Sequence, residues 1–170
     1  MRVSYKQLLV VPDELLTKWS QATKAERHLI PETPDSLRDN LLAAVIAFWG
    51  DEAIGFAGLM AAHTRQGHGL WREDCQVIEL GGAYIDPAHR GTGIWRRMVE
   101  LRLDYARLQN WFVVCITGNP TVQQGLAKIG AEPINEPADQ DLRQQLCLGC
   151  EPASSCEFCP LVDGNSWKLT

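Results

Sequence analysis

The sequence has no long apolar stretch and no cluster of positive charge. No run of about 18 apolar residues occurs, so nothing predicts a membrane-spanning helix. The N-terminus, MRVSYKQLLVVPDELL, lacks the charged start, apolar centre and small-residue cleavage site of a secretory signal. The chain has 16 Lys and Arg against 21 Asp and Glu, and a net charge of −5 disfavours binding to nucleic-acid phosphates. We therefore expect a cytoplasmic protein that binds neither nucleic acid nor membrane.

A length of 170 residues suits one domain with a sizeable core. In the N-terminal third, residues 3–10 predict a strand, and Pro12 predicts the first turn of a helix. Thr33 and Pro34 predict the cap and first position of a second helix, which should run through Leu37, Leu41 and Ala44. Residues 45–49 and 53–62 then predict two strands joined by a short turn.

A strand, a glycine loop and a long helix are predicted in succession between Val77 and Leu108. The apolar run 77–85 is of strand length, and its Gly81-Gly82 pair indicates a bulge or a close backbone approach. Ile94 begins a series of apolar residues with helical spacing, and the arginines of this helix should form its solvated face. The arginines concerned are Arg96, Arg97, Arg102 and Arg107.

The loop before this helix has the composition of an anion-binding turn. In Arg90-Gly91-Thr92-Gly93, two glycines flank one residue, so several backbone N–H groups can point into one concavity at a positive helix end. An ordinary tight turn would have the same pattern, because Gly-x-Gly alone is a weak signal.

The segment after the helix adds a second strand and a closing helix. Residues 111–117, WFVVCIT, predict a strand that ends in Gly118-Asn119-Pro120, and residues 121–129 predict a short helix that Gly130 terminates. With AYIDPAHRGTGI, Asn119 and LAKIGAEPI in this order, the chain resembles the GNAT superfamily of N-acetyltransferases. The resemblance covers about residues 77–134 and, more weakly, the N-terminal part.

This resemblance implies an α/β fold with a mixed, twisted β-sheet flanked by helices, split at the parallel strands around Tyr84 and Val114. Acetyl-CoA should bind in the split. The loop and helix start would hold its pyrophosphate, the backbone around two strand residues would pair with the pantetheine arm, and an asparagine would hydrogen-bond the same arm. These cofactor-binding residues are Tyr84, Ile85, Arg90, Gly91, Thr92, Gly93, Ile94 and Asn119.

Glu79 is the candidate general base for acetyl transfer. Attack on a thioester needs an uncharged amine, and a carboxylate inside an apolar strand should be partly desolvated, which raises its pKa. An outward-facing Glu in a salt bridge remains the alternative. Three positions depart from the family pattern, namely Ala88, Trp95 and Leu126, the last standing where the family often has a Tyr that protonates the leaving thiolate.

Four cysteines near the C-terminus form two Cys-x-x-Cys pairs that are five residues apart, at Cys147, Cys150, Cys156 and Cys159. Such pairs predict a tetrahedral structural zinc site. Disulfides and an iron–sulfur cluster remain alternatives. We expect residues 1–138 to form the acetyltransferase-like core, and residues 139–170 to form a four-cysteine segment whose last strand, 166–170, returns to the sheet.

The most concrete function that these patterns predict is transfer of an acetyl group from acetyl-CoA to a primary amine, either a small molecule or a peptide. Two alternatives come from other classes: a catalytically silent acyl-CoA sensor, which Ala88, Trp95 and Leu126 favour, and a zinc-stapled protein-interaction module. The sequence leaves open the acceptor, the length of the acyl chain, the general acid and the oligomeric state, a homodimer included.

Overall fold

The computed structural model describes residues 2–26, 29, 31–62, 71–72, 75–134 and 166–169. The chain forms two compact units, Met1–Met60 with Leu80–Tyr105, and Ala61–Glu79 with Ala106–Thr170. The predicted boundary at residue 138 lies outside the described residues. Within the described part of the chain, no helix is long and apolar enough to cross a membrane.

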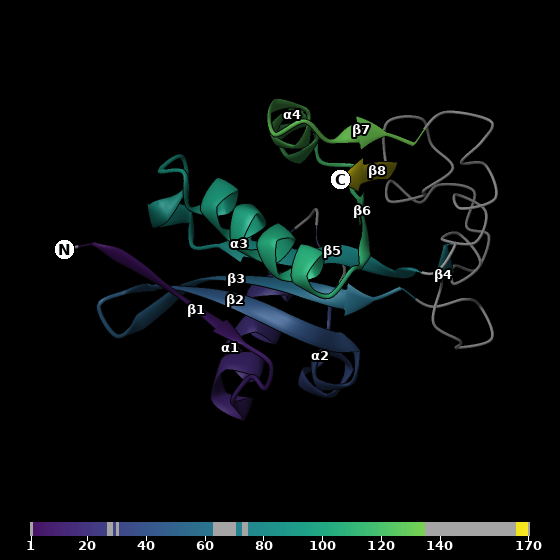
Figure 1. The fold of residues 1–170 in the computed structure, drawn as a ribbon. Coiled ribbons are helices and arrows are strands. Elements are labelled where there is room, and N and C mark those ends of the chain that lie inside the picture. Colours follow the sequence, from purple (N-terminus) through teal and green to yellow (C-terminus); the bar gives the residue numbers. More distant parts are fainter. Residues whose placement is uncertain are drawn as a thin grey trace. The chain divides into compact units, whose positions relative to one another are not determined.

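The first unit is built on an antiparallel sheet (Figure 1). Its strands pair in the order β1 (Val3–Leu8), β2 (Leu41–Trp49), β3 (Glu52–Ala61) and the later half of β5 (Cys75–Ile85). Gly50, with φ of 64°, turns the chain between β2 and β3. The predicted hairpin is confirmed.

Helices cover both faces of this sheet (Figure 1). On β2, Ala44 and Ile46 pack with α1 (Asp13–Lys24) and α2 (Pro34–Asn40), whereas the alternate residues Val45 and Ala47 pack with α3 (Ile94–Leu108). This alternation follows from the two-residue period of a strand, which sends successive side chains to opposite faces.

Caps define the helix starts. Pro12 is the N-cap of α1, so the helix begins at Asp13, one residue later than the predicted start at Pro12. Thr33 is confirmed as the N-cap of α2, since its Oγ1 accepts a hydrogen bond of 3.0 Å from the Ser36 N–H. The predicted extension of α2 through Leu41 and Ala44 is wrong, because β2 begins at Leu41. A continuous apolar run fits a fully buried strand as well as a helix face, and here pairing with β3 decides for the strand.

The second unit is a smaller sheet, whose strand order is β5, β6 (Phe112–Ile116), β8 (Ser166–Leu169) and β7 (Glu132–Pro133). The pairing of β5 with β6 is parallel, and β8 runs antiparallel to both of its neighbours. Helix α4 (Pro120–Lys128) follows β6, and the two-residue strand β4 (Trp71–Arg72) pairs with the start of β5. The predicted strand at the C-terminal end is confirmed over its described residues.

Arg102 lies in the interior and not on the solvated face of α3. Its side chain is 1% exposed, and its guanidinium donates hydrogen bonds to the backbone carbonyls of Met98, Gly58 and Gly81. The sequence predicts Arg102 on the solvated face of the helix, because arginine is rarely buried. That prediction is wrong for Arg102, whereas Arg96, Arg97 and Arg107 are exposed as expected.

Candidate functional site

Strand β5 contains the glycine pair Gly81-Gly82. Gly82 has a φ of 58°, in the left-handed region that glycine adopts without strain. The Trp19 indole Nε1 donates a hydrogen bond of 2.9 Å to the Gly82 carbonyl. The predicted close backbone approach at this pair is therefore confirmed.

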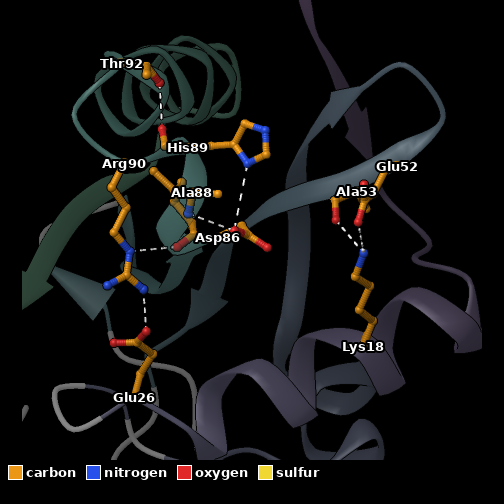
Figure 2. Close-up of polar contacts among 10 residues, drawn as sticks. Lys18, Glu26, Glu52, Ala53, Asp86, Ala88, His89, Arg90 and Thr92 are labelled. Carbon is orange, nitrogen blue, oxygen red and sulfur yellow. Dashed lines mark hydrogen bonds and ion pairs between the residues drawn. The ribbon is translucent and has the colours of Figure 1, made fainter.

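The loop that follows β5 is ordered by its own polar groups. Asp86 caps a single 3-10 turn (Pro87–His89), and its Oδ1 accepts a hydrogen bond of 2.9 Å from the Ala88 N–H. Thr92 Oγ1 donates to the His89 carbonyl at 2.6 Å (Figure 2). The short side chains of Asp86 and Thr92 thus fix the backbone on both sides of Arg90.

Two glycines with positive φ lead into helix α3. Gly91 has φ of 76° and Gly93 has φ of 84°, and a Cβ built at either one would have no atom within 4 Å. The Gly93 carbonyl accepts a hydrogen bond of 3.1 Å from the Arg97 N–H, so the helical bonding starts at the second glycine. The loop presents bare backbone at the positive end of a 15-residue helix, which is a favourable place for a phosphate.

Arg90 is tied to two neighbouring elements. Its Nε donates to the Ile85 carbonyl at 2.9 Å, and its guanidinium forms an ion pair with Glu26 (Figure 2). Its Cζ lies 5.9 Å from the centre of the Tyr84 ring. Glu26 follows α1 and is 64 residues away in sequence. Nothing in the sequence around Glu26 predicts this partner, so sequence reasoning missed it.

The surroundings of Tyr84 keep its phenol protonated. Burial raises its pKa above the ordinary value, the negative charge of Asp86 raises it further, and the positive charge of Arg90 opposes them. The ring also packs 6.5 Å from Phe56. Tyr84 is therefore a neutral hydrogen-bonding group at physiological pH.

His89 lies beside the same loop. Its Nδ1 is buried, has no hydrogen-bond partner among the described residues, and lies 3.8 Å from Asp86 Oδ1. Its ring centre is 5.8 Å from that of Trp49. The side chain is 26% exposed, so His89 is half-buried at the base of the loop.

The first unit thus brings together seven of the eight predicted cofactor-binding residues, all except Asn119. The second unit contains Asn119 and Glu79. Glu79 is half-buried on β5 and stands opposite Val114 in the parallel register. Asn119 is the N-cap of α4, and its Oδ1 accepts a hydrogen bond of 3.0 Å from the Thr121 N–H. Leu126 is fully buried in α4.

The four predicted zinc ligands lie outside the described residues. In the part of the chain that the structure describes, no group of three or more His, Cys, Asp or Glu side chains could hold a metal ion. The zinc site therefore stays a prediction from the sequence.

Residues 11–124 match the model of the acetyltransferase (GNAT) family. No curated protein sequence matches the chain. Among solved structures, Rv2747 from Mycobacterium tuberculosis, in complex with CoA and NLQ, has a TM-score of 0.65 at 19% identity, over 96% of this chain and 96% of that chain.

Two further structures share the fold. N-acetylglutamate synthase from Neisseria gonorrhoeae, complexed with coenzyme A and N-acetyl-glutamate, has a TM-score of 0.59 at 15% identity, over 85% of this chain and 32% of that chain. A GNAT family acetyltransferase from Brucella melitensis, in complex with acetyl-CoA, has a TM-score of 0.58 at 14% identity, over 77% of this chain and 83% of that chain. Since the family model spans well over half of the sequence, this chain belongs to the acetyltransferase (GNAT) family.

Proposed function

We propose that the protein transfers an acetyl group from acetyl-CoA to the primary amine of a small molecule or peptide. The observation that carries this proposal is the open glycine loop at the start of α3, in a chain of the acetyltransferase family. Three similar structures contain CoA, coenzyme A or acetyl-CoA, and one of them also contains N-acetyl-glutamate, which is an acetylated amine.

In this proposal the pyrophosphate of acetyl-CoA lies against the backbone N–H groups between Gly91 and Ile94, with Arg90 beside it. The pantetheine arm pairs with backbone groups around Tyr84 and Ile85 as an added strand. The parallel register supports this, because it pairs Val77–Glu79 with β6 while β5 continues to Ile85.

Asn119 would bind the same arm through its side-chain NH₂ group. Its Oδ1 already accepts the Thr121 N–H, which orients the amide, and an amide has two further donor hydrogens. The capping role and the proposed binding role are therefore compatible.

Glu79 would take a proton from the ammonium form of the acceptor, directly or through a water. The amine nitrogen then attacks the thioester carbon and loses a second proton to solvent, the C–S bond breaks, and CoA leaves as a thiolate. A half-buried carboxylate on a strand suits a base, because partial loss of water favours its protonated form. Leu126 cannot donate a proton, so we propose that solvent protonates the thiolate, whose pKa as a thiol is about 8.5.

Two measurements on the full-length chain test the proposal. Acetyl-CoA at about a hundred times its Kd should raise the free energy of unfolding by about 2.7 kcal/mol. Mass spectrometry should then detect CoA and acetylated product with at least one member of a panel of amines, amino acids and peptides. A saturable rise in Tm without turnover on any amine would favour the silent acyl-CoA sensor.

The role of Glu79 is tested by Glu79→Gln. Loss of a general base should lower kcat by about 10²–10⁴-fold and remove the acidic limb of the pH–rate profile. The rise in Tm on adding acetyl-CoA should stay as in the wild type, because the proposal assigns the cofactor phosphates to the glycine loop and not to Glu79. An unchanged kcat would exclude Glu79 as the base.

We also propose that the four C-terminal cysteines bind a structural zinc ion. Elemental analysis of the purified protein should give one zinc per chain, and removal of zinc by a chelator should lower Tm. Iron with visible absorption would instead indicate an iron–sulfur cluster, and the loss of free thiols without metal would indicate disulfides.

A further inference from the structure

The Trp19 side chain fills a niche that two glycines create. It is fully buried on α1 and stacks on Phe56, with ring centres 5.7 Å apart. A Cβ built at Gly58 on β3 would lie 3.2 Å from Trp19 Cη2, and one built at Gly82 on β5 would lie 3.1 Å from Trp19 Cζ2. The indole therefore lies directly against the backbone of two strands, and it has little room to shift.

Two side-chain donors hold the consecutive carbonyls of Gly81 and Gly82. Trp19 Nε1 donates to the Gly82 carbonyl at 2.9 Å. From α3, which covers the opposite face of the sheet, the buried Arg102 donates to the Gly81 carbonyl at 3.4 Å and to the Gly58 carbonyl at 2.8 Å. A carbonyl fixed in this way fixes its whole peptide group, because the peptide bond is planar and trans.

The peptide that Trp19 holds contains the Ala83 N–H, which points opposite to the Gly82 carbonyl. The Asp86 N–H donates to the Ile54 carbonyl on β3. Along a strand, the backbone N–H and C=O groups of successive residues point to alternate edges. Ile85 and Ala83 therefore turn their backbone groups to the other edge of β5. Arg90 bonds the Ile85 carbonyl on that edge, which agrees with this assignment.

We infer that Trp19 is a positioning residue for acyl transfer. It aims the Ala83 N–H at the thioester oxygen of acetyl-CoA, and Arg102 supports it by holding the preceding peptide. This inference rests on the proposed function, in which the cofactor arm lies along the Tyr84–Ile85 edge. When the amine attacks, the C=O electron pair moves to oxygen, and a hydrogen bond from the Ala83 N–H stabilises the oxyanion. The pair returns as the C–S bond breaks.

The discriminating variant is Trp19→Phe, which keeps an aromatic ring against Phe56 and removes the N–H donor. Removal of an oxyanion donor lowers kcat by about 10²–10³-fold, so loss of its alignment should lower kcat by about tenfold or more. KM for acetyl-CoA should change less than about threefold, because the loop that binds the phosphates is untouched. The matched control is Leu16→Ala, which removes another fully buried side chain of α1.

The experiment measures kcat, KM for acetyl-CoA and Tm for the wild type and both variants. A fall in kcat for Trp19→Phe alone, with Tm lowered in both variants, supports the inference. An unchanged kcat in Trp19→Phe, or an equal fall in Leu16→Ala, would overturn it. A wild type that binds acetyl-CoA without turnover would instead contradict the proposed function.

A second variant covers the case in which Trp19→Phe does not fold. Arg102→Lys keeps the positive charge but replaces the planar guanidinium that bridges Gly58 and Gly81. It should lower kcat by a larger factor than it changes KM for acetyl-CoA. A larger change in KM than in kcat would argue against the positioning role.

Discussion

Replacement of Gly82 by alanine should destabilise the protein through two separate effects. The residue has a φ of 58°, and a left-handed conformation costs an L-residue about 1–2 kcal/mol. The new Cβ would also lie 3.1 Å from Trp19 Cζ2, and Trp19 is stacked on Phe56 and cannot move aside easily. Overpacking of this kind costs about 1–3 kcal/mol. We expect a total loss of about 3 kcal/mol.

Two other glycines of the same unit isolate each effect. Gly91→Ala should show strain alone, because φ is 76° and no atom lies within 4 Å of the new Cβ. Gly58→Ala should show overpacking alone, since its Cβ would lie 2.6 Å from Leu41 Cδ2 and 3.2 Å from Trp19 Cη2 without a positive φ. Gly82→Ala should therefore be more destabilising than Gly91→Ala.

Thermal unfolding without ligand measures the three variants. At about 2–4 °C per kcal/mol for a chain of this size, Gly82→Ala should lower Tm by about 6–12 °C and Gly91→Ala by about 2–8 °C. If Gly82→Ala lowered Tm no further than Gly91→Ala, the result would contradict the close packing of Trp19 against Gly82 of β5. The assignment of Trp19 as a positioning residue would then lose its structural basis.

Three further predictions concern single side chains. Thr33→Ala removes the N-cap of α2 and should lower the free energy of unfolding by about 1 kcal/mol in urea denaturation. Burial raises the pKa of Tyr84 in the folded state, so the protonated phenol stabilises the fold fully below pH about 10, and this contribution is lost as the pH rises further. Urea midpoints measured from pH 8 to 11 should therefore fall less steeply in Tyr84→Phe than in the wild type. Leu126→Ala should cost about 2–5 kcal/mol because the side chain is fully buried, whereas Leu108→Ala, at an 81% exposed position, should change stability by less than about 0.5 kcal/mol by the same measurement.

The sequence predicts the local structure around the glycine loop well, because that structure depends on nearby residues. The apolar period from Ile94 onward predicts α3, the apolar run before Gly118 predicts β6, and positive φ follows from the glycines themselves. Gly130, which has a φ of 85°, ends α4 as predicted.

The sequence does not predict contacts between residues that are far apart in the chain. Trp19 and Gly82 are 63 residues apart, and Glu26 and Arg90 are 64 residues apart. Neither pair has a local signal. The prediction for Arg102 fails for a related reason. A charged residue is assigned to the surface unless its carbonyl partners are known, and two of these partners lie on strands β3 and β5.

The pairing of β7 with β8 has a consequence for how this protein can diversify. Glu132 stands opposite Lys168, and the Ile134 N–H donates to the Ser166 carbonyl at 2.8 Å, so residues 134 and 166 are held next to each other. Whatever length of chain joins them, its two ends are already fixed. The entropic cost of closing a loop rises only with the logarithm of its length. The sheet should therefore tolerate insertions and deletions between these residues. The sheet therefore accepts changes in the length of that segment, whereas a change that removes the four cysteines should also remove the proposed zinc site and its contribution to stability.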